Sequence, residues 1–377
     1  MKFRCERDTL AEAVATAQRA VASRTGAMPV LSGLKLTLTG DTLELVGTDL
    51  ELTIRVRIPA DGDGDGTAVV TARLFSELLQ KFDAGVVTVS LGDDEATIES
   101  GRFTSTLRTL AAAEFPRLPD ASTDGGVKVD AQAFGDALRQ VISAASRDDA
   151  RPILTGVLIA AVPEGLRFVA TDSYRLGLRD LEGVSVLAEG QKVLVAAKGL
   201  AEVQRLLGGA AASGADRKGG GEIEVVLGER DVLFRVGTTE VTTRLIEGEF
   251  PNYQQLIPSG YPNRLSVSRD ALQAAVNRVR LVGQNRDSAP IRLAMSAEGL
   301  ELSAIAQDVG EAHEALEAKY EGTDLTVAFN SQFLLDGIDA AASDEVVLES
   351  IDPLKPAVLR SPSTTDFLYL LMPVRIS

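Results

Sequence analysis

The 377-residue sequence has few of the side chains that build metal centres and disulfides: one cysteine, one histidine and no tryptophan. A single cysteine, Cys5, excludes an intramolecular disulfide and a thiolate metal cage, and it fits a reducing compartment. A single histidine, His313, excludes HExxH-type zinc sites and histidine-rich clusters. Because His313 stands among acidic residues in a predicted exposed strand, with no nucleophile motif nearby, we favour a structural role for it.

Long apolar runs and nucleotide-binding motifs are also missing. No run approaches the roughly 20 apolar residues that span a bilayer, and residues 1–14 carry charges where a signal peptide needs an apolar stretch. We therefore expect a soluble, cytoplasmic protein that does not bind membranes. The sequence has no P-loop and no G-x-S-x-G elbow. The stretch Asp61–Gly66 lacks the entering helix of a calcium loop and predicts an acidic hairpin loop.

Acidic side chains outnumber basic ones by 54 to 38, which gives a formal net charge of −16. Such acidity argues against a protein that grips nucleic acid on a basic surface. Aromatic residues make up only 5% of the chain, which gives little support for stacking platforms for single strands. The sequence thus predicts no catalytic residues, no metal and no cofactor, and the protein is not expected to be an enzyme.

One pattern occurs three times along the chain. Each copy has a helix with apolar residues at helical spacing, a proline-apolar segment, a turn between two strands and a polar residue followed by Asp. From the proline to this aspartate the distance is 20, 20 and 18 residues, in Pro29 to Asp49, Pro152 to Asp172 and Pro290 to Asp308. The helices of these first halves are predicted near 8–22, 130–146 and 269–282.

The second half of each copy begins with another helix, predicted near 72–83, 197–207 and 330–342. Thr71 and Asn330 are suitable N-cap residues for the first and last of these helices. Alternating strands follow, as at Val86–Leu91, Ile223–Leu227 and Val346–Leu348.

Polar segments near 121–126 and 258–263 predict the boundaries between the copies, which gives repeats at 1–124, 125–260 and 261–377. Two helices and roughly eight strands in each repeat predict an α+β fold, with helices on one face of antiparallel sheets. The Gly- and Ala-rich stretch 208–221 is typical of a flexible surface loop.

Two short segments admit both a structural and a functional interpretation. The pairs Thr48-Asp49 and Thr171-Asp172 predict turns that are capped by their own side chains, and for residues 171–176 a binding role stays open as well. The last ten residues, Leu368–Ser377, are apolar almost to the end, which indicates a contact surface. A last strand buried in its own core is the alternative.

Five segments resemble the bacterial sliding clamp family, the β subunits of the replicative DNA polymerase. They occur in order along the whole chain, at 1–14, Pro29–Gly33, Gly47–Glu51, Glu249–Tyr253 and Leu371–Arg375. The resemblance implies a ring-shaped, head-to-tail homodimer of six clamp units, with helices lining a hole around duplex DNA of any sequence and antiparallel sheets outside. It also implies a non-catalytic processivity factor.

The resemblance further implies a hydrophobic pocket for short linear peptides of the replicative polymerase, the clamp loader and repair proteins. Carried over by motif, its residues are Leu154, Thr171, Tyr174, Arg175, Leu176, Pro251, Gln255, Leu256, Asn330, Phe333, Leu354, Pro356, Leu370, Leu371, Met372, Pro373, Val374 and Arg375. Apolar walls would take a partner's aliphatic or aromatic anchors, while Arg and Asn would orient its backbone. The chain departs from some relatives at Ser173-Tyr174, where they have Gly-His, and at Gln255, where they have Arg.

The cations of the predicted helices and of two loops are the candidate DNA contacts: Arg24, Arg73, Lys81, Arg139, Arg151, Lys198, Arg205, Arg278 and Arg280. For the dimer interface we suggest Leu107 with Leu281 and Val282. The six predicted helices together carry a net charge of about +1 and the rest of the chain about −17, which would suit weak, mobile phosphate contacts inside a ring. The last of these helices has two aspartates and no cation, and does not fit this charge pattern.

Two other functions stay open at this point. An enzyme or small-molecule-binding protein could use the same apolar pocket, but it would need convergent polar groups that the sequence does not show. A repeat scaffold could bind proteins without encircling DNA, and sedimentation would separate such a monomer from a ring-forming dimer.

Overall fold

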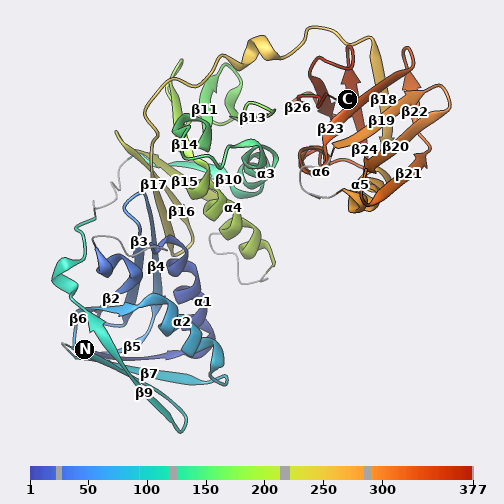
Figure 1. Cartoon of the computed structure of the whole chain (residues 1–377). Coiled ribbons are helices and arrows are strands. Elements are labelled where there is room, and N and C mark those ends of the chain that lie inside the picture. The colour runs from blue at the N-terminus through green and yellow to red at the C-terminus, as the bar shows by residue number, and fades with distance from the viewer. Residues whose placement is uncertain (23–27, 93, 119–124, 213–220, 284–289, 376–377) are drawn as a thin grey trace. The chain divides into compact units, whose positions relative to one another are not determined.

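A computed structural model describes the chain except for residues 23–27, 93, 119–124, 213–220, 284–289 and 376–377. The described residues form two compact units, each presented here by itself (Figure 1). The first compact unit comprises Met1–Gln132 and Glu202–Leu245, and the second comprises Ala133–Ala201 and Ile246–Ser377. No helix among the described residues is long and apolar enough to cross a membrane.

The first compact unit is built on one antiparallel sheet of thirteen strands. In sheet order these are β10 (Val127–Asp130), β15 (Glu222–Leu227), β16 (Asp231–Val236), β17 (Thr239–Arg244), β4 (Leu52–Pro59), β3 (Thr42–Thr48), β2 (Gly33–Thr39), β6 (Gly66–Thr71), β9 (Phe103–Leu110), β8 (Glu95–Ser100), β7 (Val86–Leu91), β1 (Lys2–Glu6) and β5 (Asp61–Asp63). Helices α1 (Arg7–Ala17) and α2 (Ala72–Lys81) pack side by side on this sheet.

The second compact unit contains a nine-stranded and a four-stranded antiparallel sheet. The larger has β14 (Lys192–Ala196), β11 (Gly156–Val162), β12 (Gly165–Thr171), β13 (Arg175–Glu182), β26 (Phe367–Leu371), β25 (Ala357–Arg360), β24 (Glu345–Ser350), β18 (Asn263–Ser268) and β22 (Lys319–Glu321), in that order. The smaller has β21 (Gly310–Leu316), β20 (Gly299–Ala306), β19 (Pro290–Ser296) and β23 (Leu325–Asn330). Helices α5 (Arg269–Val279) and α6 (Ser331–Ala340) pack together beside these sheets.

The two remaining helices, α3 (Ala131–Val141) and α4 (Ala197–Ala212), belong to the middle repeat. The division between the compact units runs through both of them. The reason lies in the sheets, because β17 of the middle repeat pairs with β4 of the first, and β13 of the middle repeat pairs with β26 of the third. Each half of the middle repeat therefore shares a sheet with a neighbouring repeat. The boundaries at 1–124, 125–260 and 261–377 remain a prediction about repeats.

The predicted α+β class and the predicted helices are confirmed, with differences at the helix ends. The first helix of each repeat ends in one turn of 3-10 helix, at Gln18–Ala20, Ile142–Ala144 and Arg280–Val282. A tighter last turn satisfies carbonyl groups that an α-helix leaves without partners. Of the predicted loop at 208–221, residues 208–212 belong to α4, and residues 213–220 lie outside the described residues.

Both predicted N-cap residues occupy the N-cap position, but only one of them caps its helix with its side chain. Asn330 caps α6, since its Oδ1 accepts a hydrogen bond from the Phe333 amide at 3.0 Å. Thr71 occupies the N-cap position of α2, but its side chain makes no capping hydrogen bond. Its backbone pairs with Gly33 in the β2–β6 ladder, so the strand rather than the side chain fixes the start of this helix.

Alternating burial along the strands explains how the core forms. In β4 the even-numbered residues Leu52, Ile54 and Val56 are buried, and the residues between them face outward. Phenylalanines complete the interior of both units, as where the rings of Phe134 and Phe168 meet edge to face with centroids 5.6 Å apart.

Candidate functional site

A tight turn links β12 to β13 at residues 171–175, and its own side chains build it. Thr171 Oγ1 accepts a hydrogen bond from the Ser173 amide and donates one to the Arg175 carbonyl. Asp172 Oδ1 accepts from the amides of Tyr174 and Arg175 at 2.9 and 3.0 Å. These bonds hold Ser173 at a φ of 81°, which a non-glycine residue rarely adopts.

The same turn recurs in the first compact unit at residues 48–52. Asp49 Oδ1 accepts from the amides of Glu51 and Leu52, and Leu50 has a φ of 78°. The predicted capping role of both Thr-Asp pairs is therefore confirmed. The turns differ at their fifth residue, which is Leu52 in the first unit and Arg175 in the second.

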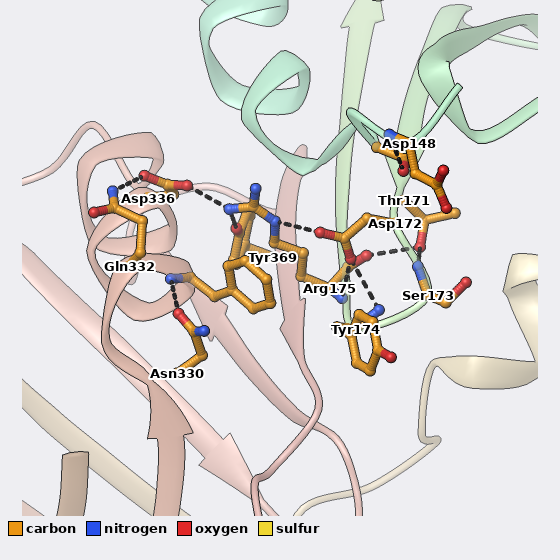
Figure 2. A network of polar contacts seen from close by, with 12 residues as sticks. Asp148, Thr171, Asp172, Ser173, Tyr174, Arg175, Asn330, Gln332, Asp336 and Tyr369 are labelled. Carbon is orange, nitrogen blue, oxygen red and sulfur yellow. Dashed lines mark hydrogen bonds and ion pairs between the residues drawn. The ribbon is translucent and has the colours of Figure 1, made fainter. Parts of the chain in front are cut away.

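The Arg175 side chain, which is 9% exposed, is the centre of a polar network (Figure 2). Its Nε donates to Asp172 Oδ2 at 2.9 Å, and its Nη1 donates to Asp336 Oδ2 and to the Tyr369 hydroxyl. The guanidinium carbon lies 4.2 Å from the centroid of the Phe333 ring. Arg175 thus joins its own turn to α6 and to β26.

Charge and burial shape the ionisation of this network. Burial alone would lower the pKa of Arg175, but Tyr369, Asp336 and Asp172 outweigh it, and the pKa of Arg175 is raised. For Tyr369 burial acts in the opposite direction, and it is the main cause of a pKa above the usual value of a tyrosine. The arginine therefore stays charged and the tyrosine stays neutral at physiological pH.

Both interpretations of the apolar C-terminal segment are correct, each for a different part of that segment. Strand β26 is buried throughout, whereas Met372 and Val374 are exposed. The Met372 amide donates to the Tyr174 carbonyl, and the Val374 amide donates to the Ala328 carbonyl, each at 2.8 Å. Hydrogen bonds from alternate residues thus fasten the tail between the 171–175 turn and β23.

Exposed apolar side chains gather on the segments that carry the predicted pocket residues. The exposed fraction is 60% for Tyr174, 69% for Leu354, 44% for Leu256 and 38% for Met372. Several other members of the set are buried: Leu154, Thr171, Leu176, Leu370 and Leu371. Leu176 and Leu370 belong to one core cluster, on which Phe250 and Ile257 pack.

The structure brings many of the predicted pocket residues into direct contact. Arg175 pairs with Leu371 and Leu176 with Leu370 across the β13–β26 ladder. For other members of the set, the chain neighbours are placed in this region by core packing, strand pairing or backbone hydrogen bonds: Pro251, Gln255, Leu256, Pro356, Pro373 and Arg375. All of them lie in the second compact unit.

Three residues of the network escape sequence reasoning as members of the site: Gln332, Asp336 and Tyr369. Asp172 belongs to the segment 171–176, for which the sequence left a binding role open. Asp336 and Tyr369 give no local signal, because only the pairing of β13 with β26 and the packing of α6 bring them to Arg175.

Most of the candidate DNA-contacting arginines are already in ion pairs. Such pairs join Arg73 to Glu77, Arg139 to Asp136, Arg151 to Asp148, Arg205 to Glu202 and Arg278 to Glu314. Arg280 donates to Gln332, whereas Lys81 and Lys198 are exposed. Arg24 lies outside the described residues. A phosphate group would have to compete with carboxylates at several of these positions, which would weaken each contact.

Among the open strand edges of the described residues are those of β9 and β21. Strand β9 pairs with β8 at Phe103–Arg108, but with β6 only at Thr109 and Leu110. Strand β21 ends the four-stranded sheet and pairs only with β20. Of the suggested interface residues, Leu281 is exposed and Val282 is half-buried, while Leu107 is already buried within its own sheet.

Acidic and histidine side chains form no cluster suited to a metal ion within the described ranges. His313 lies on exposed β21, where Nδ1 is 3.1 Å from Glu301 Oε1. In the acidic stretch 61–66, Asp65 Oδ1 accepts from the Gly40 amide and is thus turned toward backbone. No nucleophile with a neighbouring base stands out among these contacts.

Comparison with known proteins identifies the whole chain. Family models of the DNA polymerase III beta subunit match in order, with the N-terminal domain at residues 1–119, the central domain at 128–252 and the C-terminal domain at 254–375. A beta sliding clamp of Streptomyces coelicolor is 35% identical, with 100% of each sequence covered.

Solved structures agree with these sequence matches. The DNA polymerase sliding clamp of Bacillus subtilis has a TM-score of 0.87 at 27% identity, and a Pseudomonas aeruginosa sliding clamp bound to griselimycin has 0.87 at 26%. In both cases all of each chain is covered. The chain therefore belongs to the DNA polymerase III beta subunit family and is a DNA sliding clamp, a non-catalytic processivity subunit.

Proposed function

We propose that the second compact unit binds short linear peptides of the replicative polymerase, the clamp loader and repair proteins at the surface around Arg175. The observation that supports this proposal is the exposure of Tyr174, Leu354 and Met372 on segments that adjoin buried apolar residues, with the polar network of Arg175 next to Tyr174. Exposed apolar side chains that cluster on a soluble protein mark an interaction site. A partner's aliphatic or aromatic side chains would cover them.

Peptide titration with matched variants tests this proposal. Leu256 and Leu74 are both 44% exposed, but Leu74 lies on α2 in the first compact unit. We expect Leu256→Ser to weaken binding of a fluorescein-labelled peptide about tenfold, since burying a leucine contributes roughly 1.5–3 kcal/mol. Leu74→Ser should leave the affinity unchanged. Equal effects of the two variants would contradict this location of the site.

We also propose that two chains close head to tail through the open edges of β9 and β21, with Leu107, Leu281 and Val282 nearby. The charges of the two strands favour pairing of β9 with β21 over pairing of either strand with its own copy. Exposed Arg102 and Arg108 flank the open part of β9, whereas β21 carries Glu311 and Glu314. Pairing β9 with β21 of a second copy matches opposite charges, but pairing either strand with itself opposes like charges.

Charge exchange tests the interface. Sedimentation should show that Arg108→Glu and Glu311→Arg each weaken the dimer, because each places like charges on facing edges. Combining the two changes should restore at least part of the association. A dimer that neither single change weakens would overturn this edge pairing.

For DNA, we propose transient phosphate contacts from the helix cations, including Lys81 and Lys198, inside the ring. The ion pairs of the neighbouring arginines favour weak binding, which lets a clamp slide. Salt should therefore reduce direct DNA binding steeply without removing loaded protein from closed DNA. The working place of such a clamp is the bacterial cytoplasm, where the chromosome is replicated.

A further inference from the structure

We propose that Asp336 is a positioning residue of the peptide-binding site. Its carboxylate, on α6, fixes the Arg175 guanidinium and through it the elements that present Tyr174 and Met372 to a peptide. Asp336 would touch no peptide itself. The inference rests on the proposed peptide site and adds to it a residue outside the set that the family resemblance supplies.

Both carboxylate oxygens of Asp336 are held. Oδ2 accepts from Arg175, and Oδ1 accepts from Gln332 Nε2 at 2.8 Å (Figure 2). The amide of Gln332 has a fixed orientation, because its Oε1 accepts from Arg280 Nη1 at 2.9 Å and its NH₂ group must then face Asp336. A chain of hydrogen bonds therefore aims the Asp336 carboxylate at Arg175.

Helix α6 offers Arg175 two contacts from one face. Phe333 and Asp336 are three residues apart, so they are neighbours on the helix surface. The ring of Phe333 lies against the guanidinium plane while Asp336 binds its edge. Asp172 alone would tie Arg175 only to its own turn, whereas Asp336 ties that turn to α6.

Arg175 is in turn connected to the exposed apolar groups. Asp172 bonds both the Arg175 side chain and the Tyr174 amide. The Tyr174 carbonyl then accepts from the Met372 amide. Loss of the Asp336 contact would leave the guanidinium with only the Phe333 ring on α6 and would loosen the turn and the tail, which hold Tyr174 and Met372 in place.

The alternative is that Asp336 contributes only to stability. Asp339, an exposed aspartate on the same helix, provides a control with the same charge change. The probe is a short fluorescein-labelled peptide with two leucines and a phenylalanine. We expect Asp336→Asn to weaken its binding about 3–30-fold in the full-length protein, while Asp339→Asn leaves binding unchanged.

Hydrogen exchange supplies a second measurement that needs no peptide. The amides of Tyr174 and Met372 should exchange faster in Asp336→Asn than in Asp339→Asn, with unchanged exchange in the first compact unit. Asp336→Glu, which keeps the charge, should recover part of the protection and part of the affinity. This variant also replaces Asp336→Asn in both measurements should the latter fail to fold.

The outcomes separate the two proposals. Equal affinities and equal exchange in Asp336→Asn and the Asp339→Asn control would overturn the positioning role. If the parent protein does not bind the peptide at all, the proposed peptide site fails, and faster exchange at Tyr174 and Met372 still decides whether Asp336 orders these elements.

Discussion

Replacing Arg175 by Ala should destabilise the second compact unit strongly. The change removes a 9% exposed guanidinium and leaves Asp172 and Asp336 facing each other's charge without a cation. Removing one partner of a buried ion pair costs about 3–5 kcal/mol. Because Asp336 is 23% exposed and can regain some hydration, we expect the lower end of this range, about 3 kcal/mol, in the free energy of unfolding.

Tyrosine fluorescence during urea unfolding is a suitable assay. The chain has no tryptophan, and its five tyrosines are Tyr174, Tyr253, Tyr261, Tyr320 and Tyr369. All five lie in the second compact unit, so the signal follows that unit and not the first. The midpoint of the transition should fall while its slope stays unchanged.

Arg167→Ala is the matched control. Arg167 binds Asp180 through two hydrogen bonds of 2.7 Å, but both side chains are more than a fifth exposed. Solvent screening limits such a pair to about 1 kcal/mol. If Arg175→Ala lowers the free energy of unfolding by no more than Arg167→Ala does, then burial does not strengthen the Arg175 network and the reasoning fails.

Three further changes have defined outcomes. Gly337→Ala places a Cβ 2.6 Å from Tyr369 Cδ1, so overpacking should exceed the gain in helix propensity and lower stability by about 1 kcal/mol in the same fluorescence assay. Asn330→Ala removes the cap on the Phe333 amide and should cost about 1 kcal/mol, measured by thermal unfolding. Burial raises the pKa of the Cys5 thiol. The stability that the protonated thiol contributes to the fold is therefore present below the unfolded pKa of about 8.5, and it is lost as the pH rises through the higher pKa of the folded state. A thiol reagent at pH 8 should accordingly react slowly with Cys5 until the protein unfolds.

The fold could largely be predicted because its signals are local and repeated. Apolar spacing placed six helices, and the turn between two strands in each copy placed a hairpin. Sharing of sheets between repeats could not be foreseen, since no local feature of β17 specifies β4 as its partner. For the same reason the compact units differ from the repeats.

The site was predictable in its apolar part and not in its polar support. The motifs pointed to Arg175 and the C-terminal tail, which the structure brings together. The predicted role of Arg175 in orienting a partner's backbone remains a prediction, since its polar groups already bind within the chain. Asp336 counted in the sequence only as an acidic residue that did not fit a DNA-facing helix, and its partner across the fold supplies the physical reason for its charge.

The most direct test of the clamp is its retention on DNA of different topology. The protein would be loaded by its clamp loader onto linear duplex with both ends blocked by bound proteins, and onto the same duplex with free ends. A ring that encircles DNA and slides should remain on the blocked duplex and be lost from the free one. Equal retention on both, or loss from both at the same rate, would contradict the account.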